Sequence, residues 1–234
     1  MAAETIMPRH ASDLKARTLT AIVMVAVAGT ALWLGGAVWV LFVAAVCVGV
    51  LWEWNRLARR IAGGGLARLL WLVAGVAYVG IGGQVLIGMV PLFGHLGPLI
   101  PVLLVAATDI GAYFTGRALG GPKIAPAVSP SKTWSGLGGG ALLAAGVAIA
   151  LAFAAAGRYL MAEPEVVAKV AVAGVVIAVV AQIGDFFESW MKRRAGVKDS
   201  GSLLPGHGGL FDRLDGLLAV LFVAGVLVGM GRLF

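Results

Sequence analysis

The sequence predicts an all-α polytopic membrane protein with about seven transmembrane helices, an N-terminus in the cytoplasm and a C-terminus outside. The first observation is composition: 60% of the 234 residues are hydrophobic and 12% are charged, whereas soluble domains carry roughly 25% charged residues. The second is the length of the apolar runs, which match the ~20 residues that a helix needs to cross a bilayer. The third is the clustering of basic residues in alternate connections between those runs.

Seven predominantly apolar stretches have the length of a membrane span. They cover residues 18–34, 37–54, 68–90, 97–116, 136–157, 165–188 and 212–233. In the third stretch, glycines leave two alternatives open, one long helix or a span followed by a re-entrant piece. Those glycines are Gly80, Gly82, Gly83 and Gly88. Ahead of the first stretch, Glu4 and Asp13 stand among basic residues without a small-residue cleavage site, so we expect a retained first span and no signal peptide.

The basic residues predict the orientation. If the seven stretches span in turn, all but three of the 18 lysines and arginines fall on the side of the N-terminus. The exceptions are Arg158, Lys169 and Arg232. Because cytoplasmic connections are enriched in Lys and Arg, the N-terminus is predicted to lie inside. The chain then divides into a cytoplasmic N-terminal segment 1–17, N-terminal membrane helices 18–108, and a membrane region 109–234 that carries the candidate chemistry, with cytoplasmic loops 117–135 and 189–211.

Composition also excludes other classes of protein. A net charge of +7 would suggest nucleic acid in a soluble protein, but here the basic residues flank apolar runs, so no nucleic-acid partner is expected. Cys47 is the only cysteine, which excludes an intrachain disulfide or a multi-cysteine metal centre. Tryptophans near the ends of the predicted spans are expected to anchor the protein at the membrane interface. They are Trp33, Trp39, Trp52, Trp54, Trp71 and Trp190.

Acidic residues inside the spans point to function, because a carboxylate at membrane depth is costly. Asp109 and Asp185 are each predicted to lie roughly 10–12 Å inside the cytoplasmic end of their helix, at 1.5 Å per residue. Glu188 shares a helical face with Asp185, and Asp215 shares one with Asp212 at the start of the last span. The predicted topology lets all five carboxylates reach one cavity that faces the cytoplasm.

The chemistry of this cavity is predicted from its oxygen ligands and the cations beside them. Carboxylates without a Cys or His cluster suit a hard cation such as Mg²⁺. Basic and polar residues of the two cytoplasmic loops, with glycines at 206, 208 and 209, indicate phosphate groups. The residues are Ser129, Lys132, Thr133, Lys192, Arg193, Lys198 and Arg213. The plainer alternatives are that Lys192 to Arg194 only flank a span and that Asp109 only bonds to a neighbouring helix.

Beyond this chemistry, the segment SWMKRRAGVKDSGSLLPGHGGLFDRLD, from Ser189 to Asp215, resembles the signature of the phosphatidate cytidylyltransferases, or CDP-diacylglycerol synthases. The positions that match are Ser189, Lys192, Arg193, Lys198, Asp199, His207, Gly208, Gly209, Asp212, Arg213 and Asp215. Similar blocks are Asp109, Gly111, Ala112, Tyr113, Gly116 and Arg117, then Ser129 to Trp134, then Gly184-Asp185 with Glu188-Ser189. The resemblance covers about the C-terminal half of the chain. One position departs from it: Ser135 stands where the family usually has Glu.

The resemblance implies transfer of a cytidylyl group from CTP to phosphatidate, which gives CDP-diacylglycerol and pyrophosphate. It implies Mg²⁺ at one of two metal positions, held by Asp185 and Asp212, with Glu188, Asp215 and Asp109 as further ligands or as supports around them. It implies that Asp185, Asp212, Lys198 and His207 are catalytic, with His207 as either a phosphate donor or a proton carrier. The implied substrate-binding residues are Ser129, Lys132, Thr133, Ser189, Lys192, Arg193, Asp199, Gly208, Gly209 and Arg213. A homodimer among membrane lipids, in the inner (cytoplasmic) membrane with its active site facing the cytoplasm, is also expected.

Several rival functions share part of this pattern. A CDP-alcohol phosphatidyltransferase would need Ala-Arg where Ala219-Val220 follows Asp215-Gly216. A lipid or isoprenoid kinase, or a cytidylyltransferase with another lipid acceptor, stays open, as does an inactive or repurposed copy marked by Ser135. An ion-coupled transporter would also carry acids within spans, without needing the Lys-Arg-His-Gly-Gly loop. No Walker A pattern precedes Lys132, which argues against ATP-driven work.

Overall fold

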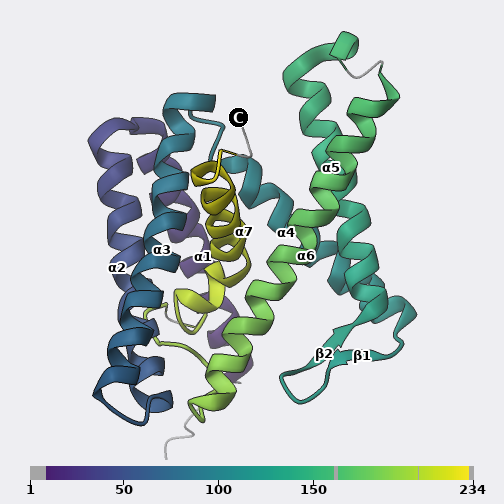
Figure 1. Cartoon of the computed structure of the whole chain (residues 1–234). Helices are drawn as coiled ribbons and strands as arrows, with labels where there is room; N and C mark the ends of the chain where they lie inside the picture. Colours follow the sequence, from purple (N-terminus) through teal and green to yellow (C-terminus); the bar gives the residue numbers. More distant parts are fainter. Residues whose placement is uncertain (1–8, 161–162, 205, 232–234) are drawn as a thin grey trace, which may run out of the picture.

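A computed structural model describes residues 9–160, 163–204 and 206–231 of the chain. Within these ranges the chain forms seven helices and one short hairpin (Figure 1). The helices are α1 (Arg9–Leu34), α2 (Gly36–Ile61), α3 (Gly65–Phe93), α4 (Leu99–Leu119), α5 (Trp134–Leu160), α6 (Pro164–Arg194) and α7 (Phe211–Gly229). The strands are β1 (Lys123–Ala125) and β2 (Ser129–Thr133). Each helix overlaps one predicted span.

The prediction of a helical membrane protein is confirmed. Five helices, α2 to α6, are long and apolar enough to cross a bilayer. The apolar part of α1, Thr18–Leu34, is shorter, and the first turns of α7 carry Asp212, Arg213 and Asp215. Seven spans, and the side on which each end of the chain lies, stay predictions.

The structure decides one open alternative and departs from expectation at two places. The third helix is continuous from Gly65 to Phe93, and two of its glycines pack against neighbouring helices: Gly83 faces Cys47 of α2 and Gly82 faces Leu218 of α7. The first helix begins at Arg9, within the predicted segment 1–17, of which residues 1–8 lie outside the described residues. The predicted loop 117–135 contains the antiparallel hairpin β1–β2, in which Lys123 pairs with Thr133.

Helix α6 occupies the middle of the architecture. It packs against α5 on one side and α7 on the other, while α2 and α3 pack together and α3 continues the contact to α7. Figure 1 shows α6 running obliquely between the group α1, α2, α3 and α7 and the group α4 and α5, with the hairpin at the same end of the molecule as the C-terminus of α6. This arrangement brings α4, α6, α7 and the hairpin around one space.

A seam of small residues holds α4 against α5. A Cβ atom added to Gly140 would lie 2.7 Å from the Thr108 carbonyl oxygen, and one added to Gly136 would lie 3.0 Å from that of Ala112. Backbones this close are typical of helix pairs joined by small residues in membranes. The hairpin between the two helices is therefore fixed at both of its ends.

Aromatic side chains form the core between α2, α3, α6 and α7. Trp54 is 2% exposed and its indole N–H donates to the Trp71 carbonyl at 2.8 Å. Trp39 is also buried and donates to the Leu86 carbonyl. The prediction that these two residues anchor the protein at the interface is therefore wrong. Proximity to a span end could not separate an indole facing lipid from one facing a neighbouring helix.

Candidate functional site

The acidic residues converge in one polar pocket, which we call the acidic pocket. Its volume is about 320 Å³. It is lined by Asp109 of α4, by Asp185, Glu188 and Lys192 of α6, by Asp199, and by Asp212, Arg213 and Asp215 of α7. The predicted convergence of the five span carboxylates is thus confirmed, although the roles assigned to them stay predictions.

Asp212 is the most heavily bonded acid of this pocket. Its Oδ1 accepts a hydrogen bond from the Lys192 ammonium at 2.8 Å, and its Oδ2 accepts from the backbone N–H groups of Ser200 and Gly209 at 2.9 and 2.8 Å. The same ammonium lies 2.6 Å from the Glu188 carboxylate. Because Lys192 stands one helical turn after Glu188, this second contact follows from the register of α6, whereas the contact with Asp212 crosses to α7. Together these bonds join α6 to α7 and to the segment between them.

The hairpin reaches the acidic pocket through one lysine. The Lys132 ammonium pairs with the Asp185 carboxylate and donates to Gln182 Oε1 at 2.9 Å. It also lies 5.1 Å from the centre of the Phe186 ring, where a cation is attracted to the face of the ring. Lys132 thus connects β2 to one face of α6 and places a positive charge beside the carboxylates.

Two acids keep their oxygens free of basic partners. Within the described part of the chain, neither Asp109 nor Asp215 forms an ion pair with a basic side chain. Glu188 also has one buried oxygen, Oε1, without a hydrogen-bond partner there. Unpaired carboxylate oxygens in a polar pocket are the donors that a hard cation prefers.

The donor set fits Mg²⁺ by chemistry, while a closed cluster of ligands is not formed. Among the residues that the structure describes, no group of three His, Cys, Asp or Glu side chains lies close enough to hold a metal ion jointly. Mg²⁺ commonly takes only one or two carboxylates and completes its shell with water and substrate phosphates. One or two of Asp109, Asp185 and Asp215, which come from three different helices, could supply these carboxylates.

The segment between α6 and α7, residues 195–210, is called the glycine loop here; residue 205 lies outside the described residues. The Leu204 N–H donates to the Gly208 carbonyl at 3.0 Å, and the His207 N–H donates back to the Leu204 carbonyl at 2.9 Å. Gly208 has φ +85°, which favours glycine. Arg213 donates to the His207 carbonyl at 2.7 and 3.1 Å. The loop is therefore folded back on the start of α7.

The loop glycines were predicted to turn backbone N–H groups toward a phosphate, but two of them lie against carboxylates of the protein instead. The Gly209 N–H is bonded to Asp212 rather than turned to an open space. A Cβ atom on Gly208 would lie 3.1 Å from Asp212 Oδ2 and 3.4 Å from Asp199 Oδ1. His207 lies at this turn, and its Nδ1 is buried without a partner among the described residues. The glycines allow the backbone to approach these carboxylates closely.

Several predicted binding residues lie outside the lining of the acidic pocket. Ser129 and Thr133 are buried in β2. The Thr133 hydroxyl accepts from the Gly136 N–H at 3.1 Å at the start of α5, which is how a threonine caps a helix. Lys198 and Arg193 are exposed, and Arg193 donates to the Val128 carbonyl at 3.4 Å.

The predicted cytoplasmic loop 189–211 begins too early. Helix α6 continues to Arg194, so Ser189, Lys192 and Arg193 are helical. Basic residues in the last turn are favourable there, because they interact with the negative end of the helix dipole. Ser135 likewise has a local partner: its hydroxyl donates to the Gly120 carbonyl and lies 3.1 Å from the Thr133 hydroxyl, so it joins the end of α4 to the start of α5.

The sequence-based reading missed Glu53 of α2. This side chain is 0% exposed. Its Oε2 accepts hydrogen bonds from the Ser200 hydroxyl at 3.0 Å and from the Phe211 N–H at 2.8 Å. A carboxylate in the predicted span 37–54 meets the same cost argument that singled out Asp109, and that signal could have found it.

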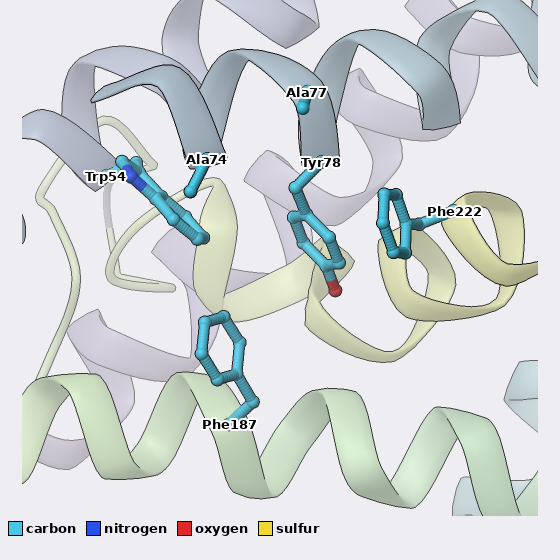
Figure 2. Close-up of a pocket in the computed structure, with 6 residues that line it drawn as sticks. All are labelled: Trp54, Ala74, Ala77, Tyr78, Phe187 and Phe222. Atoms are coloured by element: carbon cyan, nitrogen blue, oxygen red, sulfur yellow. The ribbon is translucent and has the colours of Figure 1, made fainter. Parts of the chain in front are cut away.

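A second pocket lies between α2, α3, α6 and α7 and is called the aromatic pocket here. Its volume is about 370 Å³. It is lined by Trp54, Ala74, Ala77, Tyr78, Phe187 and Phe222. Figure 2 shows the rings of Trp54, Tyr78, Phe187 and Phe222 gathered from these helices around a common space. Without a charged side chain in its lining, this pocket does not offer phosphate or metal chemistry.

The acidic pocket lies within the part of the chain that matches a known family. Residues 64–230 match the family model described as "Cytidylyltransferase family". The chain is 37% identical to a phosphatidate cytidylyltransferase of Brucella suis, over 95% of this chain and 95% of that protein. It is 35% identical to one of Pseudomonas aeruginosa, over 92% of this chain and 97% of that protein. The chain therefore belongs to the cytidylyltransferase family, and within it to the phosphatidate cytidylyltransferases.

Proposed function

We propose that this protein transfers a cytidylyl group from CTP to phosphatidate in the acidic pocket and releases CDP-diacylglycerol and pyrophosphate. The observation that carries the proposal is the pocket itself, in which five carboxylates from three helices adjoin Lys192 and Arg213. Both substrates are polyanions, so they need cations and a metal-binding surface in one place. The named relatives supply the identity of the substrates.

In the proposed reaction, a phosphate oxygen of phosphatidate forms a bond to the α-phosphorus of CTP. The bond from that phosphorus to the bridging oxygen breaks, and pyrophosphate leaves with the electron pair. A phosphate monoester carries close to two negative charges at neutral pH, so the nucleophile is already ionised and needs no base to remove a proton. The side chains therefore act mainly by positioning and by stabilising charge.

The basic side chains have distinct positions for this task. Lys192 and Arg213 line the acidic pocket, and Lys132 enters from the hairpin beside Asp185. We assign these three cations to the phosphates of CTP and phosphatidate. Lys198, on the exposed side of the glycine loop, is assigned to the incoming triphosphate. His207, whose backbone carbonyl holds Arg213, is assigned to phosphate binding.

The metal is assigned to carboxylates that three different helices bring to the acidic pocket. One or two of Asp109, Asp185 and Asp215 would hold Mg²⁺, with Glu188 and Asp212 beside them as supports through their shared partner Lys192. When bound, Mg²⁺ would neutralise phosphate charge in the substrate and in the leaving pyrophosphate. A second cation position is part of the proposal, as are a homodimer and an orientation in the inner membrane with the acidic pocket facing the cytoplasm.

The test is CTP-dependent conversion of phosphatidate by the purified full-length chain in liposomes, with and without Mg²⁺. The informative variants are Asp109→Asn and Asp215→Asn, which remove charge where the carboxylate has no basic partner. Glu165→Gln is the matched control, because Glu165 pairs with Lys169 on the exposed surface of α6. Loss of product in the two aspartate variants and retention in the control support the proposal. Full activity in both aspartate variants would contradict the assignment of the site.

The same assay tests whether phosphatidate or another lipid phosphate accepts the cytidylyl group. Phosphatidate is replaced by an isoprenoid phosphate while CTP and Mg²⁺ are kept. Product from phosphatidate alone supports the proposed function. Product from the isoprenoid phosphate alone would identify a cytidylyltransferase with another acceptor.

A further inference from the structure

We propose that Glu53 is a positioning residue of the acidic pocket: from α2, it holds the glycine loop in the conformation that places Asp199 and Asp212. The inference rests on the proposed function and extends it to a helix that contributes no side chain to the pocket lining. Glu53 also lies outside the residues that match the family model, 64–230.

The segment from Ser200 to Phe211 is closed at this carboxylate. Ser200, the sixth residue of the glycine loop, donates its hydroxyl to Glu53 Oε2, and Phe211, the first residue of α7, donates its backbone N–H to the same oxygen. These partners are separated from Glu53 by 147 and 158 residues along the chain. A single buried acceptor thus bridges the two ends of this segment.

Ser200 is held on three sides. Its N–H donates to Asp212 at 2.9 Å, its hydroxyl donates to Glu53 at 3.0 Å, and its carbonyl accepts from Arg56 at 2.8 Å. It is 0% exposed, so water does not compete for these bonds. Asp199 is its immediate neighbour and lines the acidic pocket. The position of Ser200 therefore couples α2 to two acids of the pocket.

The glycines around Glu53 fit this role. A Cβ atom on Gly209 would lie 2.6 Å from Glu53 Oε2, and one on Gly201 would lie 2.9 Å from Glu53 Cγ and closer still to its carboxylate. Neither glycine needs a positive φ for its backbone. Their small size is explained by the close approach of the loop to the buried carboxylate.

The variants are chosen to separate position from charge. Glu53→Gln keeps an oxygen that can accept both hydrogen bonds, whereas Glu53→Ala removes the acceptor. Ser200→Ala removes one hydroxyl and leaves the backbone bonds in place. Glu165→Gln on the exposed surface of α6 serves as the matched control.

The first readout is limited trypsin digestion of the full chain in detergent, which requires neither substrate. Cleavage after the exposed Lys198 reports local opening of the glycine loop. We expect Glu53→Ala to be cleaved at least about tenfold faster and Ser200→Ala by a smaller factor, with Glu53→Gln and the control close to the native rate. An unchanged rate in Glu53→Ala would overturn the proposal.

The second readout is steady-state kinetics, in which kcat and the KM for CTP are measured separately. We expect Glu53→Ala to lower kcat/KM by roughly 100-fold, the cost of misplacing groups by about 1 Å. We expect Glu53→Gln to retain most of the native kcat/KM. Equal loss in Glu53→Gln and Glu53→Ala would overturn a positioning role, because the charge itself would then be required. If the native chain makes no product while Glu53→Ala still opens the loop, the proposed function fails and the positioning of the loop by Glu53 stands.

Discussion

Two consecutive residues of α6 line two different pockets, the apolar aromatic pocket and the charged acidic pocket. Phe187 lines the aromatic pocket, and Glu188 lines the acidic pocket. Successive residues of a helix point about 100° apart, so one step along α6 changes an apolar contact into a site for charge. Their volumes, about 370 and 320 Å³, are similar. What separates them is therefore the charge and hydrogen bonding of the lining rather than the available space.

Removal of divalent metal is expected to have the largest effect on the activity of the acidic pocket. Incubation with EDTA is expected to abolish CTP-dependent product formation, and added Mg²⁺ to restore it, because the acidic pocket presents oxygen ligands to a hard cation. Thermal unfolding followed in the same detergent should shift upward when Mg²⁺ is added to the native chain. Full activity in EDTA would contradict a metal site in the acidic pocket.

Asp212→Asn is expected to lower kcat/KM by roughly 10³-fold. An amide in this position turns its N–H₂ group toward the Lys192 ammonium or toward the N–H groups of Ser200 and Gly209, all of which are donors. The measurement is steady-state kinetics with CTP varied at saturating phosphatidate. Activity within threefold of the native chain would show that this network is dispensable.

Lys132→Gln is expected to cause a smaller loss, roughly 10²-fold, because the hairpin contributes one cation to a site that retains Lys192 and Arg213. Combining it with Asp185→Asn tests the contact itself. If the two side chains act together, the double variant loses much less than the product of the two single losses. Fully multiplicative losses would mean that Lys132 and Asp185 act independently.

Phe187→Leu is expected to have the smallest effect on chemistry, leaving kcat/KM within about threefold. It removes ring contacts with Trp54 and Tyr78, so a loss of about 1 kcal/mol in stability is expected. Activity and thermal unfolding measured on one preparation distinguish the two outcomes. A loss comparable to that of Asp212→Asn would remove the functional distinction between the pockets.

The features that could be predicted from the sequence are those for which a bilayer imposes a large energetic cost, namely the apolar helices and the carboxylates within them. Long apolar runs located the seven helices of the described residues, and the cost of burying carboxylates singled out Asp109, Asp185 and the pair Asp212 and Asp215. Both signals are strong because a bilayer penalises exceptions. The predicted topology allowed these carboxylates to reach one cavity, and the structure brings them together there.

The hairpin, the Thr133 cap and the role of Glu53 were not predicted, because they depend on short local structure or on contacts between residues far apart in the sequence. The hairpin has strands of three and five residues, too short for a clear alternating pattern. Thr133 before the apolar run of α5 carries a capping signal, but its position beside Lys132 suggested substrate binding instead. Glu53 stands between Trp52 and Trp54, and its partners lie 147 and 158 residues away, so local sequence does not reveal them.

The hydrogen bond between Glu53 and Ser200 can form only late in synthesis of the chain. Synthesis proceeds at about 5–20 residues per second, so the 147 residues that separate the two positions take roughly 7–30 seconds to add. Throughout that interval α2 carries a carboxylate whose donors have not been made. A nascent chain that stops before Ser200 lacks both donors to Glu53 Oε2, so the hydrogen bonds that join α2 to the glycine loop and to α7 are among the last to form.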